Sequence, residues 1–188
     1  MSQAFDKYEK LGAYHWDWYD NPDYAWYKVC VDRCVKFCKG RTLDLGCGDG
    51  LVMQKIKDNG FKVHGFENDN TAIRIVYDND MRASWVDLDD LENYGIWQSE
   101  PFDYMVCLNT IEHLKTPEMI IKIFKQCVMK AGIIITDKAT EHKGRYHEHE
   151  YTKEELLDTF KEFNPKYFVI NSTEFGKPIQ FHGVEIKK

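Results

Sequence analysis

The sequence predicts an α/β protein in which a mainly parallel sheet carries helices on both faces. Three observations support this class. Strand-like and helix-like segments alternate through residue 163, the first strand-like segments end in acidic residues, and a glycine-rich turn follows the first strand. Such alternation is typical of parallel sheets, because parallel strands are joined by helical crossovers. A chain of 188 residues can bury one sizeable core but is too short for two ordinary domains.

Apolar runs and helix signals place the elements in order along the chain. Gly40 and Gly60 are natural helix stops, and Thr152 with Glu155 forms a capping box at the start of a late helix. The other predicted helices are 23–39, 51–59, 70–79 and 117–130. The predicted strands are 41–45, 61–67, 83–86, 102–108 and 132–136, followed by a pair at 168–172 and 180–186 that is joined through 176–178.

The most informative segment is LDLGCGDG at residues 43–50. Its acid, Asp44, is followed by glycines at alternate positions, Gly46, Gly48 and Gly50. Glycine adopts positive φ without steric cost and lets the backbone approach a ligand closely. We therefore expect a cofactor-binding turn at the carboxyl end of the first strand. A dinucleotide-binding turn would have a glycine where this chain has Leu51, which disfavours that class.

The order D-x-G-x-G-x-G resembles motif I of the class I S-adenosylmethionine (SAM) methyltransferases. Residues 102–114, FDYMVCLNTIEHL, are also similar to a segment of small-molecule methyltransferases that include the ubiquinone-biosynthesis O-methyltransferases. The resemblance covers about residues 41–163. It implies a Rossmann-like sheet of seven strands, mainly parallel, with an antiparallel last strand.

The resemblance also implies which residues hold the methionine end of SAM. These are Asp44, Leu45, Gly46, Cys47 and Gly48, where the backbone passes close to the cofactor. The carboxylate of Asp44 would favour the ammonium group of the ligand.

The rest of the cofactor is expected to lie along the ends of the next strands. Glu67, with its neighbour Asn68, corresponds to the acid that accepts hydrogen bonds from both ribose hydroxyls. Asp87 and Leu88 correspond to the adenine contacts, although Asp87 could equally cap a following helix. Asn109 would lie under the sulfonium and its methyl group.

The catalytic candidates are Glu112 and His113. Methyl transfer from a sulfonium mainly requires aligned and desolvated reactants, but a hydroxyl or amine acceptor also needs a base, for which His113 is the candidate. The alternative is that both residues only fix the loop after the fourth strand. Thr110 and Ile111 stand where N-P-P-Y amino-group methyltransferases have prolines, so oxygen is favoured over nitrogen as the acceptor atom.

A second interpretation groups Glu112 and His113 with His147 or His149. The set resembles the metal site of small-RNA 2′-O-methyltransferases, but Asn109 replaces the first glutamate of their E-x-x-E-H motif. One carboxylate and two or three imidazoles could still hold a divalent metal ion. A metal-assisted 2′-O-methyltransferase of RNA or nucleotides therefore stays open as an alternative, as does a non-catalytic SAM-binding regulator or partner subunit.

Residues 1–40 are expected to form a helical and aromatic segment ahead of the SAM-binding domain at 41–188, within a single domain overall. Aromatic side chains cluster there at Tyr14, Trp16, Trp18 and Tyr19. They could form a lid that excludes water from the reaction. Packing beneath the N-terminal helix is the alternative.

Charge and composition limit the partners. The net charge of −6 disfavours nucleic acid and anionic membranes, although Lys138, Lys143 and Arg145 could attract an anionic substrate. We expect a small-molecule acceptor, with nucleic acid not excluded. No run approaches the roughly 18 apolar residues of a membrane span, and no signal-peptide core is present, which predicts a cytoplasmic protein. The sequence identifies neither the acceptor nor the oligomeric state.

The cysteines are expected to be reduced. Cys30, Cys34 and Cys38 repeat at helical spacing and are expected to face the core as small apolar side chains, not to bind a metal cluster. No disulfide framework is implied.

Overall fold

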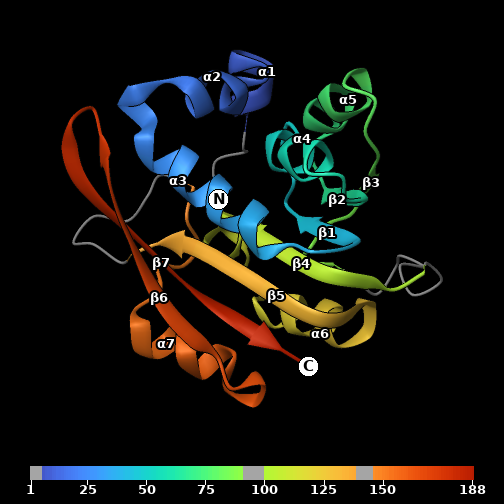
Figure 1. Ribbon diagram of the computed structural model, residues 1–188, viewed down its shortest axis with the longest axis vertical. Helices are drawn as coiled ribbons and strands as arrows, with labels where there is room; N and C mark the ends of the chain where they lie inside the picture. The colour runs from blue at the N-terminus through green and yellow to red at the C-terminus, as the bar shows by residue number, and fades with distance from the viewer. Residues whose placement is uncertain (1–5, 91–99, 139–145) are drawn as a thin grey trace.

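A computed structural model describes residues 6–90, 100–138 and 146–188, and a single seven-stranded sheet forms its centre (Figure 1). The strand order is β3-β2-β1-β4-β5-β7-β6. Strand β7 pairs antiparallel with both β5 and β6, whereas the other neighbouring strands pair parallel. The strands are β1 (Thr42–Leu45), β2 (Val63–Glu67), β3 (Ala83–Trp85), β4 (Phe102–Leu108), β5 (Val128–Asp137), β6 (Lys166–Glu174) and β7 (Lys177–Lys187). The predicted fold class is confirmed.

Helices cover both faces of this sheet, α6 and α7 on one face and α3 and α4 on the other (Figure 1). The α-helices are α1 (Lys7–Leu11), α2 (Tyr14–Asp20), α3 (Ala25–Phe37), α4 (Leu51–Asp58), α5 (Asn70–Asp78), α6 (Glu118–Cys127) and α7 (Lys153–Thr159). Short 3-10 helices occur at η1 (Pro22–Tyr24), η3 (Ile111–His113) and η4 (Lys161–Phe163). No helix within the described ranges has the length and apolarity needed to cross a membrane.

Strand β4 explains why the central strands read as continuous apolar runs. Met105 and Cys107 belong to the core cluster that includes α6 and α7, whereas Val106 and Leu108 belong to the cluster that includes α3 and α4. Successive side chains of a strand point to opposite faces, so a strand covered on both faces must be apolar at every position.

The prediction is wrong at the junction of α6 and β5. We expected the helix to continue to residue 130 and the strand to begin at 132, but α6 ends at Cys127 and β5 begins at Val128. Val128 is fully buried and pairs with Phe102 of β4. Tertiary pairing therefore extends the strand into residues whose local pattern favoured a helix.

The final hairpin is longer than the predicted strands at 168–172 and 180–186. Strands β6 and β7 continue to a two-residue turn at Phe175 and Gly176, whose φ angles of 47° and 73° are both positive. Two left-handed residues form the type of turn that matches the twist of paired strands. The tip contacts the N-terminal segment, since the N–H of Phe175 donates to the carbonyl of Asp23 at 2.7 Å.

All six cysteines are buried free thiols. Cys30, Cys34 and Cys38 are fully buried in the core cluster beneath α3, so the prediction that they face the core is confirmed. Burial raises the pKa of each of the six thiols.

Candidate active site

The carboxyl end of β1 continues directly into the predicted glycine turn. Gly46, Gly48 and Gly50 have φ angles of 65°, 53° and 83°, in the left-handed region that only glycine adopts freely. A Cβ at Gly46 would collide with the side chain of Thr110, and one at Gly48 would collide with the hydroxyl of Tyr8. The turn therefore requires glycine at these two positions for both conformation and space.

Glu67, at the end of β2, is fixed beside this turn by backbone donors. Its Oε2 accepts a hydrogen bond from the N–H of Gly48 at 2.9 Å. Its Oε1 accepts from the N–H groups of Asn68 and Asp69, both at 2.9 Å. Burial raises the pKa of Glu67, and the three N–H donors oppose that effect. The carboxylate is thus fixed at the carboxyl end of β2 beside the glycine turn, and its contact with ribose stays a prediction.

Asp44 is buried in β1, and its Oδ2 has no hydrogen-bond partner among the described residues. Burial, with the nearby Glu67, raises the pKa of Asp44. An uncompensated buried carboxyl oxygen is unfavourable unless a ligand or counter-charge meets it. This orphaned oxygen, beside a turn that a Cβ would fill, fits a cofactor with an ammonium group such as SAM.

Other predicted cofactor residues could contribute through the backbone. The side chains of Leu45 and Leu88 lie in the core cluster under α6, and that of Cys47 lies among buried residues of α4 and α5. Asn68 is exposed, and its carbonyl accepts from Trp85 Nε1 at 2.8 Å.

Asp87 follows β3 and shapes its own loop. Its Oδ1 accepts from the N–H of Asp89 at 3.0 Å, as in an Asx turn. A helix capped by Asp87 would begin at Leu88, but Leu88 and Asp89 form a turn and Asp90 is not helical. The capping alternative is therefore wrong, and the adenine contact of Asp87 stays a prediction.

A second group of polar side chains gathers where β4 and β5 end. Asn109, at a φ of 49°, donates from Nδ2 to Oδ1 of Asp137 at 2.8 Å. Glu112 is 1% exposed and accepts from the hydroxyl of Thr136 at 2.9 Å, whereas its Oε1 has no partner among the described residues. Burial, followed by the repulsion of Asp137, raises the pKa of Glu112 to about 8.

His113 is held in the form that a general base requires. Its Nδ1 lies 3.0 Å from the carbonyl oxygen of Tyr146. A carbonyl only accepts hydrogen bonds, so Nδ1 carries the proton and the lone pair is on Nε2. Burial lowers the pKa of His113, and the nearby His147 and Lys7 lower it further. The imidazole is therefore neutral at pH 7.

The geometry selects His147, not His149, as the partner of this pair. One donor atom each from Glu112, His113 and His147 lies within 4.8 Å of the others. The side chain of His149 is 46% exposed, and its Nε2 lies 3.7 Å from Glu155 Oε1. A carboxylate with two imidazoles fits a divalent ion such as Zn²⁺, and Oε1 of Glu112 has no hydrogen-bond partner among the described residues.

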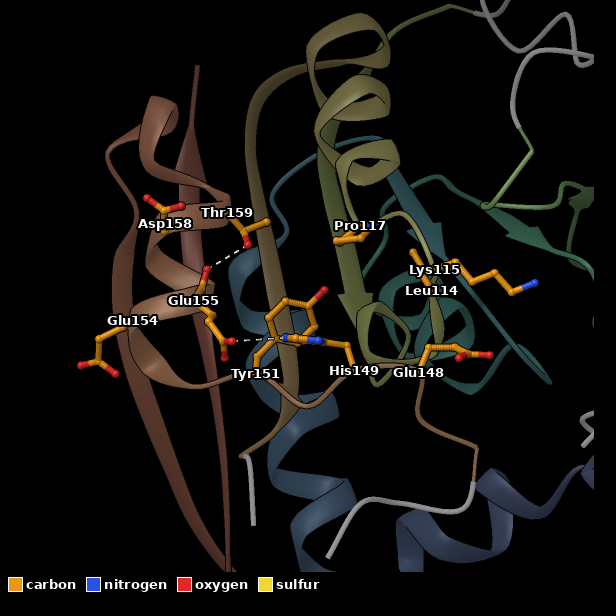
Figure 2. Close-up of a pocket in the computed structure, with 10 residues that line it drawn as sticks. All are labelled: Leu114, Lys115, Pro117, Glu148, His149, Tyr151, Glu154, Glu155, Asp158 and Thr159. Carbon is orange, nitrogen blue, oxygen red and sulfur yellow. Dashed lines mark hydrogen bonds and ion pairs between the residues drawn. The ribbon is translucent and has the colours of Figure 1, made fainter. Parts of the chain in front are cut away.

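A pocket of about 690 Å³ adjoins this cluster, between the turn after β4 and helix α7 (Figure 2). The N–H groups of Glu148 and His149, which line it, donate to the carbonyl of Glu112 at 2.8 and 3.1 Å. None of the predicted cofactor residues lines this pocket, so it is separate from the glycine turn. Its lining residues are Leu114, Lys115, Pro117, Glu148, His149, Tyr151, Glu154, Glu155, Asp158 and Thr159.

The aromatic side chains predicted to form a lid have two different surroundings, the glycine turn and the outer side of α3. Tyr14 is buried with its ring centroid 5.4 Å from that of Tyr8, and Trp16 Nε1 donates to the carbonyl of Asp49 in the glycine turn at 3.2 Å. Tyr19 instead donates to Asp32 on α3 at 2.6 Å and therefore lies on the outer side. The lid role itself stays a prediction.

The glycine turn and the polar cluster at the ends of β4 and β5 also contain residues that were not predicted from the sequence. Asp137 could have been found, because it ends β5 as Glu67 ends β2. Lys7 and Asp49 depend on tertiary contacts, since Lys7 Nζ lies 5.4 Å from the ring centroid of Tyr146. Glu150 lies 3.4 Å from His147 Nδ1 through its Oε1. The basic residues 143 and 145 fall outside the described residues.

Residues 25–169 match the family model described as a methyltransferase domain. The chain belongs to this methyltransferase family. Membership confirms the predicted class, a SAM-dependent methyltransferase, and with it the predicted cofactor. The family match begins within the segment 1–40, and the proposed division at residue 40 stays a prediction.

The methyltransferase is similar to curated ubiquinone biosynthesis O-methyltransferases. It is 28% identical to that of Rickettsia typhi over 114 residues, which cover 57% of this chain and 44% of the relative. It is 26% identical to that of Saccharophagus degradans over 157 residues, 77% of this chain and 65% of the relative. The aligned region thus spans less than two thirds of either relative.

Solved structures share the fold at low identity. Magnesium protoporphyrin IX methyltransferase from Synechocystis PCC 6803, with bound S-adenosylhomocysteine (SAH), matches with a TM-score of 0.73 at 12% identity, covering 97% of both chains. TehB from Haemophilus influenzae matches with a TM-score of 0.65 at 14% identity, covering 86% of this chain and 62% of that chain. These matches confirm the Rossmann-like methyltransferase fold.

Proposed function

We propose that this methyltransferase transfers the methyl group of SAM to an oxygen atom of a small-molecule acceptor. The observation that carries the proposal is the neutral His113 at the end of β4, whose ring is oriented by the carbonyl of Tyr146. The O-methyltransferase relatives support oxygen as the acceptor atom. They lend no support to an RNA methyltransferase or a non-catalytic regulator.

Binding in this proposal uses the chain's own polar groups at three strand ends. The backbone of Gly46–Gly48 and the carboxylate of Asp44 hold the methionine end, and Glu67 accepts from the ribose hydroxyls. Asp87 and the N–H of Leu88 hold the adenine. The bound cofactor supplies an electrophilic methyl group.

Proton removal in this proposal belongs to His113. Its Nε2 accepts the proton of the acceptor hydroxyl as the oxygen attacks, and a positioned base of this kind contributes on the order of 10²–10⁴-fold to the rate. The Tyr146 carbonyl keeps the proton on Nδ1, so the basic nitrogen stays on the ring's other side. Asn109 and Asp137, joined by a 2.8 Å hydrogen bond, line the end of β4 and β5 next to it.

A divalent ion is an alternative proposal for the same cluster, because the single lone pair on Nε2 of His113 cannot both bind a cation and accept a proton. Glu112, His113 and His147 would hold it, and it would lower the pKa of a hydroxyl bound to it. Glu112 must lose its proton to bind a cation, so binding would strengthen as pH rises towards the pKa of about 8.

The test is transfer of labelled methyl groups from SAM to a panel of phenols, catechols and matched anilines, with and without EDTA. We expect methyl ethers as products and no N-methyl products. Methylation of anilines alone would contradict the proposal. So would the absence of any methylation by parent protein that binds SAH. Activity unchanged by EDTA would end the metal proposal and leave His113 as the base.

A further inference from the structure

Helix α2 begins against the glycine turn without a cap of its own. Its N-cap residue is Ala13, whose side chain cannot accept a hydrogen bond. Asp49 of the turn takes this place, since its Oδ2 accepts from the N–H of His15 at 3.0 Å. Its Oδ1 also lies 3.2 Å from Nδ1 of the His15 ring. The carboxylate that caps α2 is therefore supplied by the glycine turn.

This contact is buried and has more than one component. Asp49 is 1% exposed, although it lies on a turn between a strand and a helix. Its carbonyl accepts from Trp16 Nε1 at 3.2 Å, so consecutive residues of α2 are bound to one residue of the turn. The ring of His15 stacks on Tyr27 of α3 with centroids 4.9 Å apart, which holds the imidazole against Asp49.

Helices α1 and α2, held in this way, contact both the glycine turn and the surroundings of His113. Tyr8 on α1 places its hydroxyl against Gly48, where a Cβ would collide with it. Lys7, the first residue of α1, lies 5.4 Å from the ring of Tyr146, the residue whose carbonyl orients His113. The two helices lie next to each other (Figure 1), joined by the rings of Tyr8 and Tyr14.

We propose that Asp49 is a positioning residue that couples cofactor binding to the docking of α1 and α2 over the glycine turn. The inference rests on the proposed function in one respect, that SAM binds at this turn. A ligand held by the backbone of Gly46–Gly48 restricts the orientation of the next residue, Asp49, and hence the cap of α2. By linkage, docking of α2 must then raise cofactor affinity by the same factor as binding favours docking.

A purely structural cap is the competing explanation. Asp49 would then stabilise α2 equally in the presence and absence of cofactor. The two explanations differ in whether protection of α2 responds to the ligand.

The test measures amide hydrogen exchange and calorimetric binding of SAH with the full chain. In the parent protein, SAH is expected to slow exchange of the amides of residues 14–20. Asp49→Ala removes both carboxyl oxygens, including the acceptor for the N–H of His15, and we expect SAH to bind about 5- to 30-fold more weakly with little remaining effect on these amides. Amides of β4 and β5 should be unchanged.

Two further variants complete the design. His15→Ala keeps the backbone N–H but loses the ring, so a smaller loss of affinity, about 2- to 5-fold, is expected. Asp20→Ala is the matched control, because it removes a carboxylate from an exposed position at the other end of α2 and should bind SAH as the parent does.

The outcomes separate the two proposals. If the parent protein does not bind SAH, the assignment of the glycine turn as the SAM site fails. If the parent binds SAH but α2 exchanges at the same rate with and without it, or if Asp49→Ala binds SAH as tightly as the parent, the coupling proposal fails alone. Faster exchange of α2 in Asp49→Ala by the same factor with and without SAH would show a purely structural cap.

Discussion

The glycine turn and the cluster of Glu112, His113 and His147 each contain a buried glutamate at or after the end of a parallel strand, but the surroundings of the two carboxyl groups differ. Glu67 accepts three backbone N–H groups. Glu112 accepts one side-chain hydroxyl and keeps an oxygen without a partner among the described residues. Burial raises the pKa of both glutamates, and hydrogen bonds oppose that rise in both. At Glu67 the opposing donors are three backbone N–H groups, whereas at Glu112 the repulsion of Asp137 adds to burial and the pKa reaches about 8. Glu67 is thus a fixed acceptor, and Glu112 is a group that can gain or lose a proton near neutral pH.

The largest effect is expected from His113→Gln, in the cluster of Glu112, His113 and His147. Loss of the base should lower kcat by roughly 10²–10⁴-fold while SAH binding stays unchanged. In the parent protein, kcat should decrease at acid pH, and the pH at which it decreases should lie below 6.5. The reason is that a base must be neutral and that burial lowers the pKa of His113 from 6.5. Steady-state kinetics between pH 5 and 9 measure both.

His149→Gln is the matched control for that experiment, since it removes an imidazole from the same segment but from an exposed position. It should keep the parent kcat. An unchanged kcat in His113→Gln would show that His113 is not the base and that this loop has a purely structural role.

The next effect concerns Glu112 and pH. Its folded pKa of about 8 lies above the usual 4.5, so its contribution to stability is present below pH 4.5 and lost as pH rises through 8. Glu112→Gln imitates the neutral acid and should be more stable than the parent at pH 9, by on the order of a few kcal/mol, but not at pH 4. Urea unfolding of metal-free protein at pH 4, 7 and 9 gives this difference.

Glu118→Gln, at an exposed position of the following helix, should show no such pH-dependent gain. A constant difference between Glu112→Gln and the parent at every pH would mean that the pKa of Glu112 is the same in the folded and the unfolded protein. The contrast between the two glutamates would then disappear.

The smallest of the three effects is expected at the glycine turn, from Glu67→Gln. The amide offers one acceptor oxygen to three N–H donors and carries no charge, so SAH should bind roughly 10- to 100-fold more weakly. Calorimetric titration measures this, with the exposed Glu154→Gln as a control that should bind normally. Unchanged binding would show that the ribose site lies elsewhere.

The same contrast explains what could be predicted from the sequence. The turn is local: Asp44 and the three glycines lie within seven residues, and Glu67 required only the end of the next strand. Alternating apolar runs likewise indicated the parallel sheet. Such features follow from backbone conformation and strand order, both of which leave a regular pattern.

The cluster is assembled from distant segments, so its details could not be predicted. Asn109 meets Asp137 across two neighbouring strands, and Thr136 reaches Glu112 within the same region. His147 and His149 differ by two positions on an irregular segment, and nothing local distinguishes them. Pairing with Phe102 likewise decided where β5 begins.

The buried thiols have a practical consequence, because a disulfide-exchange reagent needs both access and a thiolate. Burial removes the access of the reagent and disfavours the thiolate at all six cysteines. The rate at which such a reagent is consumed should therefore report how often the fold opens. Cys47 stands within the glycine turn itself, so its labelling would time the opening of that turn separately from the rest of the molecule.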